Sequence, residues 1–234
     1  MAGSATPIPS SMSHSQVTRI FAVRHGETAW NVDTRIQGHL DIPLNDTGRW
    51  QARRMAAALA DEPIAAIYSS DLRRAHETAQ ALGEAVGVAV QTDTGLRERG
   101  FGSFQGLTFK EIEARWPDLA LRWRKRDPSF GPEGGETLAS FYARVVEAAT
   151  RLARRHPGEA IALVAHGGVM DCLYRLASGV SLQAPRTWEL GNASINRLLY
   201  NGEGFVLVGW GDTQHLADGT RDESSDGDRV GHAA

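Results

Sequence analysis

Ile-Phe-Ala-Val-Arg-His-Gly-Glu-Thr, at residues 20–28, is the stretch that decides the fold of this chain. The β-branched and aromatic run Val17–Val23 predicts a strand, which stops at the polar cluster Arg24-His25-Gly26-Glu27. The same change occurs twice more: Ile64–Tyr68 runs into a cluster at residues 69–74, and Ala160–Ala165 ends at His166-Gly167-Gly168. Ligands of open α/β sheets bind outside the carboxyl ends of the strands. We therefore expect these three clusters to converge in space.

Helix-like segments alternate with the strands along the rest of the chain. Apolar residues at helical spacing predict a helix over Asp46–Ala60, with Asn45 as its cap. Further helices are expected over residues 72–86, 109–126, 137–156 and 167–178, a third strand over 88–91, and a closing hairpin from 194–200 and 205–210. This order predicts an α/β fold, a three-layer α/β/α sandwich with a mostly parallel central sheet.

Composition and charge narrow the class of protein. The 234 residues are 41% hydrophobic and 23% charged, which fits one large globular domain. The net charge of −3 gives no reason to expect nucleic acid or a membrane surface as a partner, and no apolar stretch approaches the ~20 residues of a membrane span. The only cysteine, Cys172, lies in an apolar run and is expected to be buried rather than reactive. Without a second thiol there is no internal disulfide, and a reducing cytoplasm is the expected compartment.

The expected domain covers residues 17–212. Residues 1–16 are rich in Ser, Pro and Gly and lack the apolar core of a secretory signal. Residues 213–234 are rich in Asp, Gly and Ser and cannot bury much apolar surface. Both ends are expected to be disordered tails. A homodimer is compatible with the sequence, which does not decide the oligomeric state.

The polar clusters have the composition of a site for phosphoryl transfer without a metal ion. Arg24 and Arg74 offer planar guanidinium donors suited to a phosphate dianion, and helices beginning near Asp71 and Gly167 would aim backbone N–H groups at it. Neutral imidazole can form a covalent intermediate, and neighbouring arginines would keep His25 neutral. Glu98, expected on a loop after the third strand, can supply a proton to the leaving oxygen. No cluster has zinc spacing and no glycine loop matches a nucleotide fingerprint, so neither metal nor cofactor is expected.

The order of these motifs resembles that of the histidine phosphatase superfamily, the phosphoglycerate mutase-like branch. Arg24-His25-Gly26-Glu27-Thr28 resembles its R-H-G-E/Q-T signature, and the resemblance spans about residues 20–210. The other matching segments are Gln37-Gly38 with Pro43-Leu44-Asn45, Ser70-Asp71-Leu72-Arg73-Arg74, Leu96-Arg97-Glu98 with its following glycines, and Val164-Ala165-His166-Gly167-Gly168. The resemblance implies a phosphoglycerate mutase-like fold.

The resemblance also implies a role for each matching residue. His25 becomes the phosphorylated nucleophile, Glu98 the proton donor, and Arg24, Arg74 and His166 the phosphate pocket. Asn31, Gln37, Gly38 and Gly167 match positions that bind substrate. Arg74 is preferred to Arg73, because Arg73 occupies the variable position of S-D-L-x-R.

Three functions remain open at this stage. The first is a phosphatase acting on a small phosphorylated metabolite through phosphohistidine, the second a phosphoglycerate mutase, and the third a non-catalytic phosphate binder. The interval between Glu98 and His166 is short and carries Phe101-Gly102-Ser103-Phe104 where mutases carry a tyrosine, which favours the phosphatase. The basic run Arg122–Arg126 is either a solvated helix face or a basic lip over the pocket. His39, His76, His156 and His215 match no catalytic position and are read as surface or structural residues.

Overall fold

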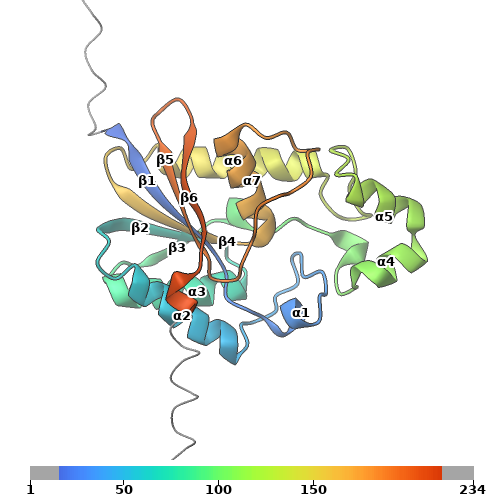
Figure 1. The fold of residues 1–234 in the computed structure, drawn as a ribbon, viewed down its shortest axis with the longest axis horizontal. Helices are drawn as coiled ribbons and strands as arrows, with labels where there is room; N and C mark the ends of the chain where they lie inside the picture. Colours follow the sequence, from blue (N-terminus) through green and yellow to red (C-terminus); the bar gives the residue numbers. More distant parts are fainter. Residues whose placement is uncertain (1–15, 218–234) are drawn as a thin grey trace, which may run out of the picture.

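A six-stranded sheet forms the centre of the molecule, as seen in a computed structural model that describes residues 16–217 (Figure 1). The strands are β1 (Thr18–Arg24), β2 (Ile64–Ser69), β3 (Val90–Thr92), β4 (Ala160–Ala165), β5 (Ile195–Tyr200) and β6 (Phe205–Asp212). Their order in the sheet is β3-β2-β4-β1-β5-β6. The first four in this order are parallel, and the β5–β6 hairpin pairs antiparallel with β1. The predicted fold class is confirmed.

Helices cover both faces of this sheet. They are α1 (Ala29–Val32), α2 (Asp46–Ala58), α3 (Arg73–Val86), α4 (Phe109–Arg115), α5 (Pro117–Arg124), α6 (Leu138–Ala153), α7 (Gly167–Ser178) and α8 (Gln214–Ala217). Figure 1 shows α6 and α7 on one side of the sheet and α2 and α3 on the other. The predicted cap of α2 is confirmed, because the Asn45 side chain accepts a hydrogen bond from the Gly48 N–H.

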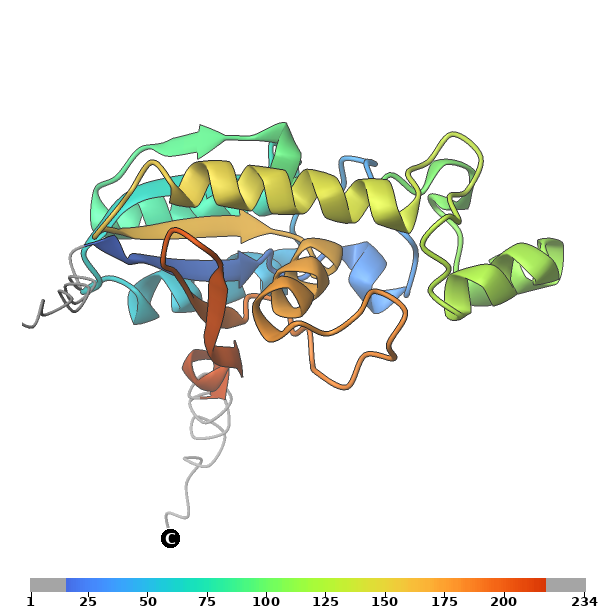
Figure 2. The ribbon, with the colours of Figure 1, turned by 90° about the horizontal axis from the view of Figure 1, so that it is seen from above.

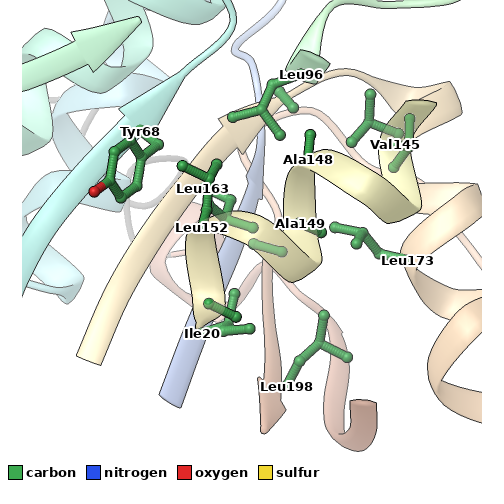
Figure 3. Packing of buried hydrophobic residues seen from close by; sticks show 14 of the residues in the cluster. Ile20, Tyr68, Leu96, Val145, Ala148, Ala149, Leu152, Leu163, Leu173 and Leu198 are labelled. Atoms are coloured by element: carbon green, nitrogen blue, oxygen red, sulfur yellow. The ribbon is translucent and has the colours of Figure 1, made fainter. Parts of the chain in front are cut away.

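Alternation along β1 explains why both faces are covered. Ile20 and Ala22 pack against α6 and α7, whereas Phe21 and Val23 face α2 and α3. The neighbouring strand β4 is buried along its whole length, as expected for a central parallel strand. Figure 3 shows the first of these two cores, in which Val145, Ala148, Ala149 and Leu152 of α6 meet Leu163 of β4 and Ile20 of β1.

The single helix expected over residues 109–126 is two helices. Pro117 has no backbone N–H and restricts the residue before it, and Trp116 accordingly adopts φ −140° and ψ 70°. The chain turns there, and α4 and α5 lie toward the side to which the β1 and β4 arrows point (Figure 2). They have a small core of their own, built on Phe104, Ile112, Ala120 and Phe130. This pair of helices forms a separate lobe beside the sheet.

The expected tails lie mostly outside the described residues. On the C-terminal side, the folded chain continues past the expected boundary at residue 212 into α8. His215 forms a hydrogen bond of 3.1 Å to the Ala193 carbonyl, and Arg54 donates to the His215 carbonyl at 2.9 Å. These contacts attach α8 to the domain.

Cys172 lies in the core between α7 and the sheet. It is 1% exposed, and burial raises the pKa of its thiol well above the usual range. The expectation of a buried side chain is confirmed.

Candidate active site

The three polar clusters meet at one edge of the sheet. Arg24 ends β1, and in the sheet register it pairs with Ala165, the last residue of β4, so His25 and His166 follow side by side. Their ring centroids are 5.2 Å apart, and both side chains are buried. Parallel pairing of β2 with β4 brings Ser70 to the same place. The predicted convergence is confirmed.

Backbone contacts and burial keep the His25 ring neutral and leave one of its nitrogens free. Its Nδ1 lies 2.7 Å from the Gly26 carbonyl, which can only accept, so Nδ1 carries the hydrogen and Nε2 keeps its lone pair. Burial lowers the pKa of His25 well below its usual range, and the charges of Arg74 and Arg24 lower it further. The sequence had pointed to the arginines alone, but burial is the larger cause.

His166 is arranged as a hydrogen-bond donor. Its Nε2 lies 2.8 Å from Ser70 Oγ, which already accepts a hydrogen bond from the Leu72 N–H and can therefore donate to Nε2. With Ser70 as the donor, Nδ1 carries the ring hydrogen, and Nδ1 is buried without a partner among the described residues. Burial and nearby positive charge again lower the pKa of the ring. A phosphate oxygen would supply the missing acceptor.

Two guanidinium groups add fixed positive charge. Arg74 is 1% exposed and donates to the carbonyls of Leu40 and Gly38 at 2.9 and 2.8 Å, while its Nε has no partner among the described residues. Burial lowers the pKa of Arg74 to about 10, which still leaves it charged at neutral pH. Arg24 donates to the Leu190 carbonyl and also has an unpartnered Nε. Arg73 points away from the site, where it pairs with Glu77 on the surface.

The glycines at the site serve different purposes. No side chain caps the N-terminus of α7, and a Cβ on Gly167 would lie 3.4 Å from Arg24 Nε, so this glycine keeps the helix start open to an anion. A Cβ on Gly26 would instead lie 2.4 Å from the Gly48 carbonyl oxygen, and one on Gly168 would lie 2.1 Å from Glu98 Oε1. Gly26 allows α2 to pack closely, and Gly168 makes room for the carboxyl group.

Glu98 is held by main-chain contacts beside the histidines. Its two carboxyl oxygens accept hydrogen bonds from the N–H groups of Arg99 and Gly168 at 2.8 and 3.0 Å. Its backbone carbonyl accepts from His39 Nε2 at 2.8 Å and from Arg144 at 3.2 Å. His39, read from the sequence as surface or structural, thus supports the loop that carries Glu98.

Glu98 and His25 line the same small cavity, whose volume is about 190 Å³. Asn31, Gln37 and Gly38 also line it, as does Arg35, to which the sequence analysis assigned no role. Gln37 is buried and its Oε1 has no partner among the described residues, whereas Asn31 Oδ1 accepts hydrogen bonds from Thr28. All the predicted site residues therefore lie in or directly beside one anion-sized cavity.

Comparison with known proteins agrees with this geometry. The family model of the histidine phosphatase superfamily (branch 1) matches residues 20–213. The chain belongs to this superfamily.

Among its relatives, phosphoglycerate mutase-like protein 4 of Arabidopsis thaliana is 43% identical, over 84% of this chain and 86% of the relative. A metal-independent phosphoserine phosphatase of the same plant is 35% identical, over 87% and 85%. The structure of a mycobacterial glucosyl-3-phosphoglycerate phosphatase with VO3 superposes with a TM-score of 0.76 at 36% identity, covering 83% of this chain and 99% of that one.

Several contacts of this histidine phosphatase could not be assigned from sequence. Ser70 stood inside a recognised motif, but nothing in the motif shows that its hydroxyl contacts His166. The supporting bonds from His39 and Arg144 join segments far apart in the chain and have no local signal. Within residues 16–217, no group of three or more His, Cys, Asp or Glu is placed to hold a metal ion, and no helix is long and apolar enough to cross a membrane.

Proposed function

We propose that this histidine phosphatase hydrolyses a small phosphomonoester through a phosphohistidine intermediate on His25. The observation that carries the proposal is the state of His25, which is buried and neutral, with Nε2 free, and close enough to Arg74 and Arg24 for their charges to lower its pKa. Glu98 stands on the same cavity, within reach of a leaving oxygen. The phosphatase names of two relatives support hydrolysis of a small phosphorylated metabolite.

The first half-reaction phosphorylates His25. Arg24, Arg74, the His166 Nδ1–H and the start of α7 hold the phosphate oxygens. Nε2 attacks phosphorus, the bond from phosphorus to the leaving oxygen breaks, and Glu98 gives that oxygen a proton, so that an alcohol departs. The imidazolium that forms keeps its Nδ1–H on the Gly26 carbonyl.

The second half-reaction returns the enzyme to its starting state. Glu98, now a carboxylate, takes a proton from a water molecule whose oxygen attacks the phosphohistidine. The bond from phosphorus to Nε2 breaks, inorganic phosphate leaves, and His25 is again neutral.

The mutase alternative is less favoured. A mutase must hold its substrate and exclude water while the phosphoryl group returns to another hydroxyl. Phe101 lines the cavity where the mutase pattern carries a tyrosine, and its ring has no hydroxyl to donate.

Trapping the intermediate tests the proposal. Brief incubation with labelled substrate followed by quenching should give an adduct that is stable to alkali and labile to acid. His25→Ala should abolish the adduct, whereas His76→Ala, at a histidine outside the site, should leave it unchanged. An adduct that persists in His25→Ala would refute the assignment, and transfer of label to a second hydroxyl of the substrate without release of phosphate would favour the mutase.

A further inference from the structure

A second cavity adjoins the one that contains His25. Its volume is about 200 Å³, and it shares Glu98 and Phe101 with the first cavity. A residue that protonates the leaving oxygen has to stand between the phosphoryl group and the rest of the substrate. Since Glu98 lies on both cavities, the second one offers space to the leaving group.

Three arginines line this second cavity, and their surroundings differ. Arg99 is 4% exposed, and its Nε and Nη2 donate to the backbone carbonyls of Glu136 and Phe130 at 3.0 and 2.7 Å. Within residues 16–217, no carboxylate is hydrogen-bonded to its guanidinium group, and burial lowers its pKa only to about 10. Arg99 is therefore a buried cation held by neutral groups.

Arg186 is the second of the three. It lies on the loop before β5, is exposed, and has no hydrogen bond or ion pair to another residue in the described part of the chain. It is close enough to Arg24 for its charge to lower the pKa of that arginine. A cation placed toward another cation, without an acidic partner, favours an anionic ligand.

Arg126 is the third, and its backbone is strained. It follows α5 with φ +54°, a conformation that favours glycine at the end of a helix. Its side chain donates to Asp171 of α7 and to the Leu182 carbonyl, both at 2.6 Å. These contacts explain why an arginine stands where the backbone would favour glycine. They also join the α4–α5 lobe to the loop that carries Arg186.

The basic residues of the run 122–126 thus differ in their surroundings. Arg122 pairs with Asp127 and Arg124 with Glu113, both on the surface. Among the basic residues of this run, Arg126 alone lines the cavity. The solvated-face interpretation holds for the first two, and the basic-lip interpretation applies to the third.

The charge in this second cavity is unbalanced. Arg99, Arg126 and Arg186 face two carboxylates, Glu98 and Asp171, and Asp171 is shared with a further arginine, Arg175. Trp123, Phe101 and Phe141 supply apolar walls, which reduce the screening of these charges by water.

We propose that the second cavity binds a carboxylate on the leaving group, so that the preferred substrates are phosphorylated hydroxy acids. The inference rests on the proposed phosphatase function. Arginine suits this task because its planar donors match the two oxygens of a carboxylate. Arg186 and Arg99 would supply the donors, and Arg126 would hold the wall in place.

Matched substrate pairs test the inference. Phosphoserine and phosphoethanolamine differ by one carboxylate, and 3-phosphoglycerate and glycerol 3-phosphate differ by a carboxylate in place of a hydroxymethyl group. In the wild type, kcat/KM should be roughly ten- to a hundred-fold higher for the acid of each pair, the range expected for one charge-assisted contact. Arg186→Gln should reduce this ratio about ten-fold or more.

Two further variants test the role of Arg126 and provide a control for the loss of one positive charge. Arg126→Gly removes the guanidinium group while retaining a residue that tolerates the positive φ, so it should fold and also lower the ratio. Arg155→Gln removes one charge between α6 and β4, at the opposite edge of the sheet, and should leave the ratio unchanged.

The outcomes separate the two proposals. Equal kcat/KM within each pair, or a ratio that Arg186→Gln does not change, would overturn the carboxylate subsite while hydrolysis itself stands. No turnover of either pair or of an aryl phosphate would instead refute the phosphatase function, and the subsite with it.

Discussion

At the residue scale, Glu98 is positioned by neutral groups rather than by a cation. Its carboxyl oxygens contact the N–H groups of Arg99 and Gly168, and no ion pair to its side chain occurs among the described residues. A carboxyl group held in this way can change its protonation state without breaking a salt bridge. This suits a residue that gives a proton in one step and takes one in the next.

Glu98→Gln should therefore affect substrates according to their leaving group. An alkyl phosphate needs a proton on its leaving oxygen, so phosphorylation of His25 should slow by roughly 10²–10⁴-fold. An aryl phosphate leaves with little help and should lose much less. Single-turnover phosphorylation rates on both substrates measure the difference. His25→Ala should lose both classes together, and equal losses for Glu98→Gln would show that another group is the acid.

We also predict, at the residue scale, that the activity does not depend on a metal ion. The phosphate ligands that we assign are arginines, histidines and amides, so the charge of the phosphate is offset without a bound cation. Exhaustive treatment with a chelator should leave kcat/KM unchanged. Activity that falls and then returns on addition of Mg²⁺ or Zn²⁺ would contradict the proposed set of phosphate ligands.

At the scale of the element, the start of α7 links the proposed phosphate site to Glu98, the proposed acid. His166 precedes the helix, Gly167 opens it, and the Gly168 N–H donates to Glu98. One helix terminus thus fixes His166 and Glu98 relative to each other. The length of β4 and its parallel register with β1 place that terminus beside His25.

Gly168→Ala should disturb the acid more than the nucleophile. The added methyl would lie 2.1 Å from Glu98 Oε1 and would displace the carboxyl group. We expect a selective loss of roughly ten- to a hundred-fold on alkyl phosphates, with aryl phosphates much less affected. Gly209→Ala is the control, since a Cβ there meets no atom within 4 Å. Steady-state kinetics on both substrates measure the outcome, and a uniform loss would contradict it.

At the scale of the whole molecule, the buried site makes stability depend on pH. The pKa values of His25 and His166 are lowered, mainly by burial, and that of His215 is lowered in the same direction. Below about pH 6.5 the unfolded chain takes up these protons and the folded chain does not. The stability that the neutral rings contribute is present above that pH and is lost as the pH falls below it. Carboxylates with lowered pKa values, such as Asp71 and Glu136, act in the same direction but only at more acidic pH.

The free energy of unfolding should therefore fall between about pH 6.5 and 5, by on the order of 1 kcal/mol per pH unit for each buried histidine. Urea denaturation at a series of pH values measures this slope. His166→Asn should flatten it, whereas His76→Asn, with the histidine outside the site, should not. An unchanged slope in His166→Asn would show that the site histidines do not govern the acid stability.

The sequence by itself determined the order of strands and helices and the strand-end positions of the chemical groups. Apolar periodicity and caps such as Asn45 are local signals, and the convergence of His25, Arg74 and His166 follows from the rule that parallel strands end at one edge. The single helix predicted over residues 109–126 is wrong, because Pro117 lacks a backbone N–H and divides the segment into two helices despite its apolar spacing.

Only the tertiary structure decided which atoms contact one another. The bond from Ser70 to His166, the hold of Arg126 on α7, and the place of Glu98 between two cavities each join segments far apart in the chain. Such contacts depend on how the helices pack on the sheet and on which side chains burial leaves unpaired. The spacing of residues along one segment predicts neither of these features.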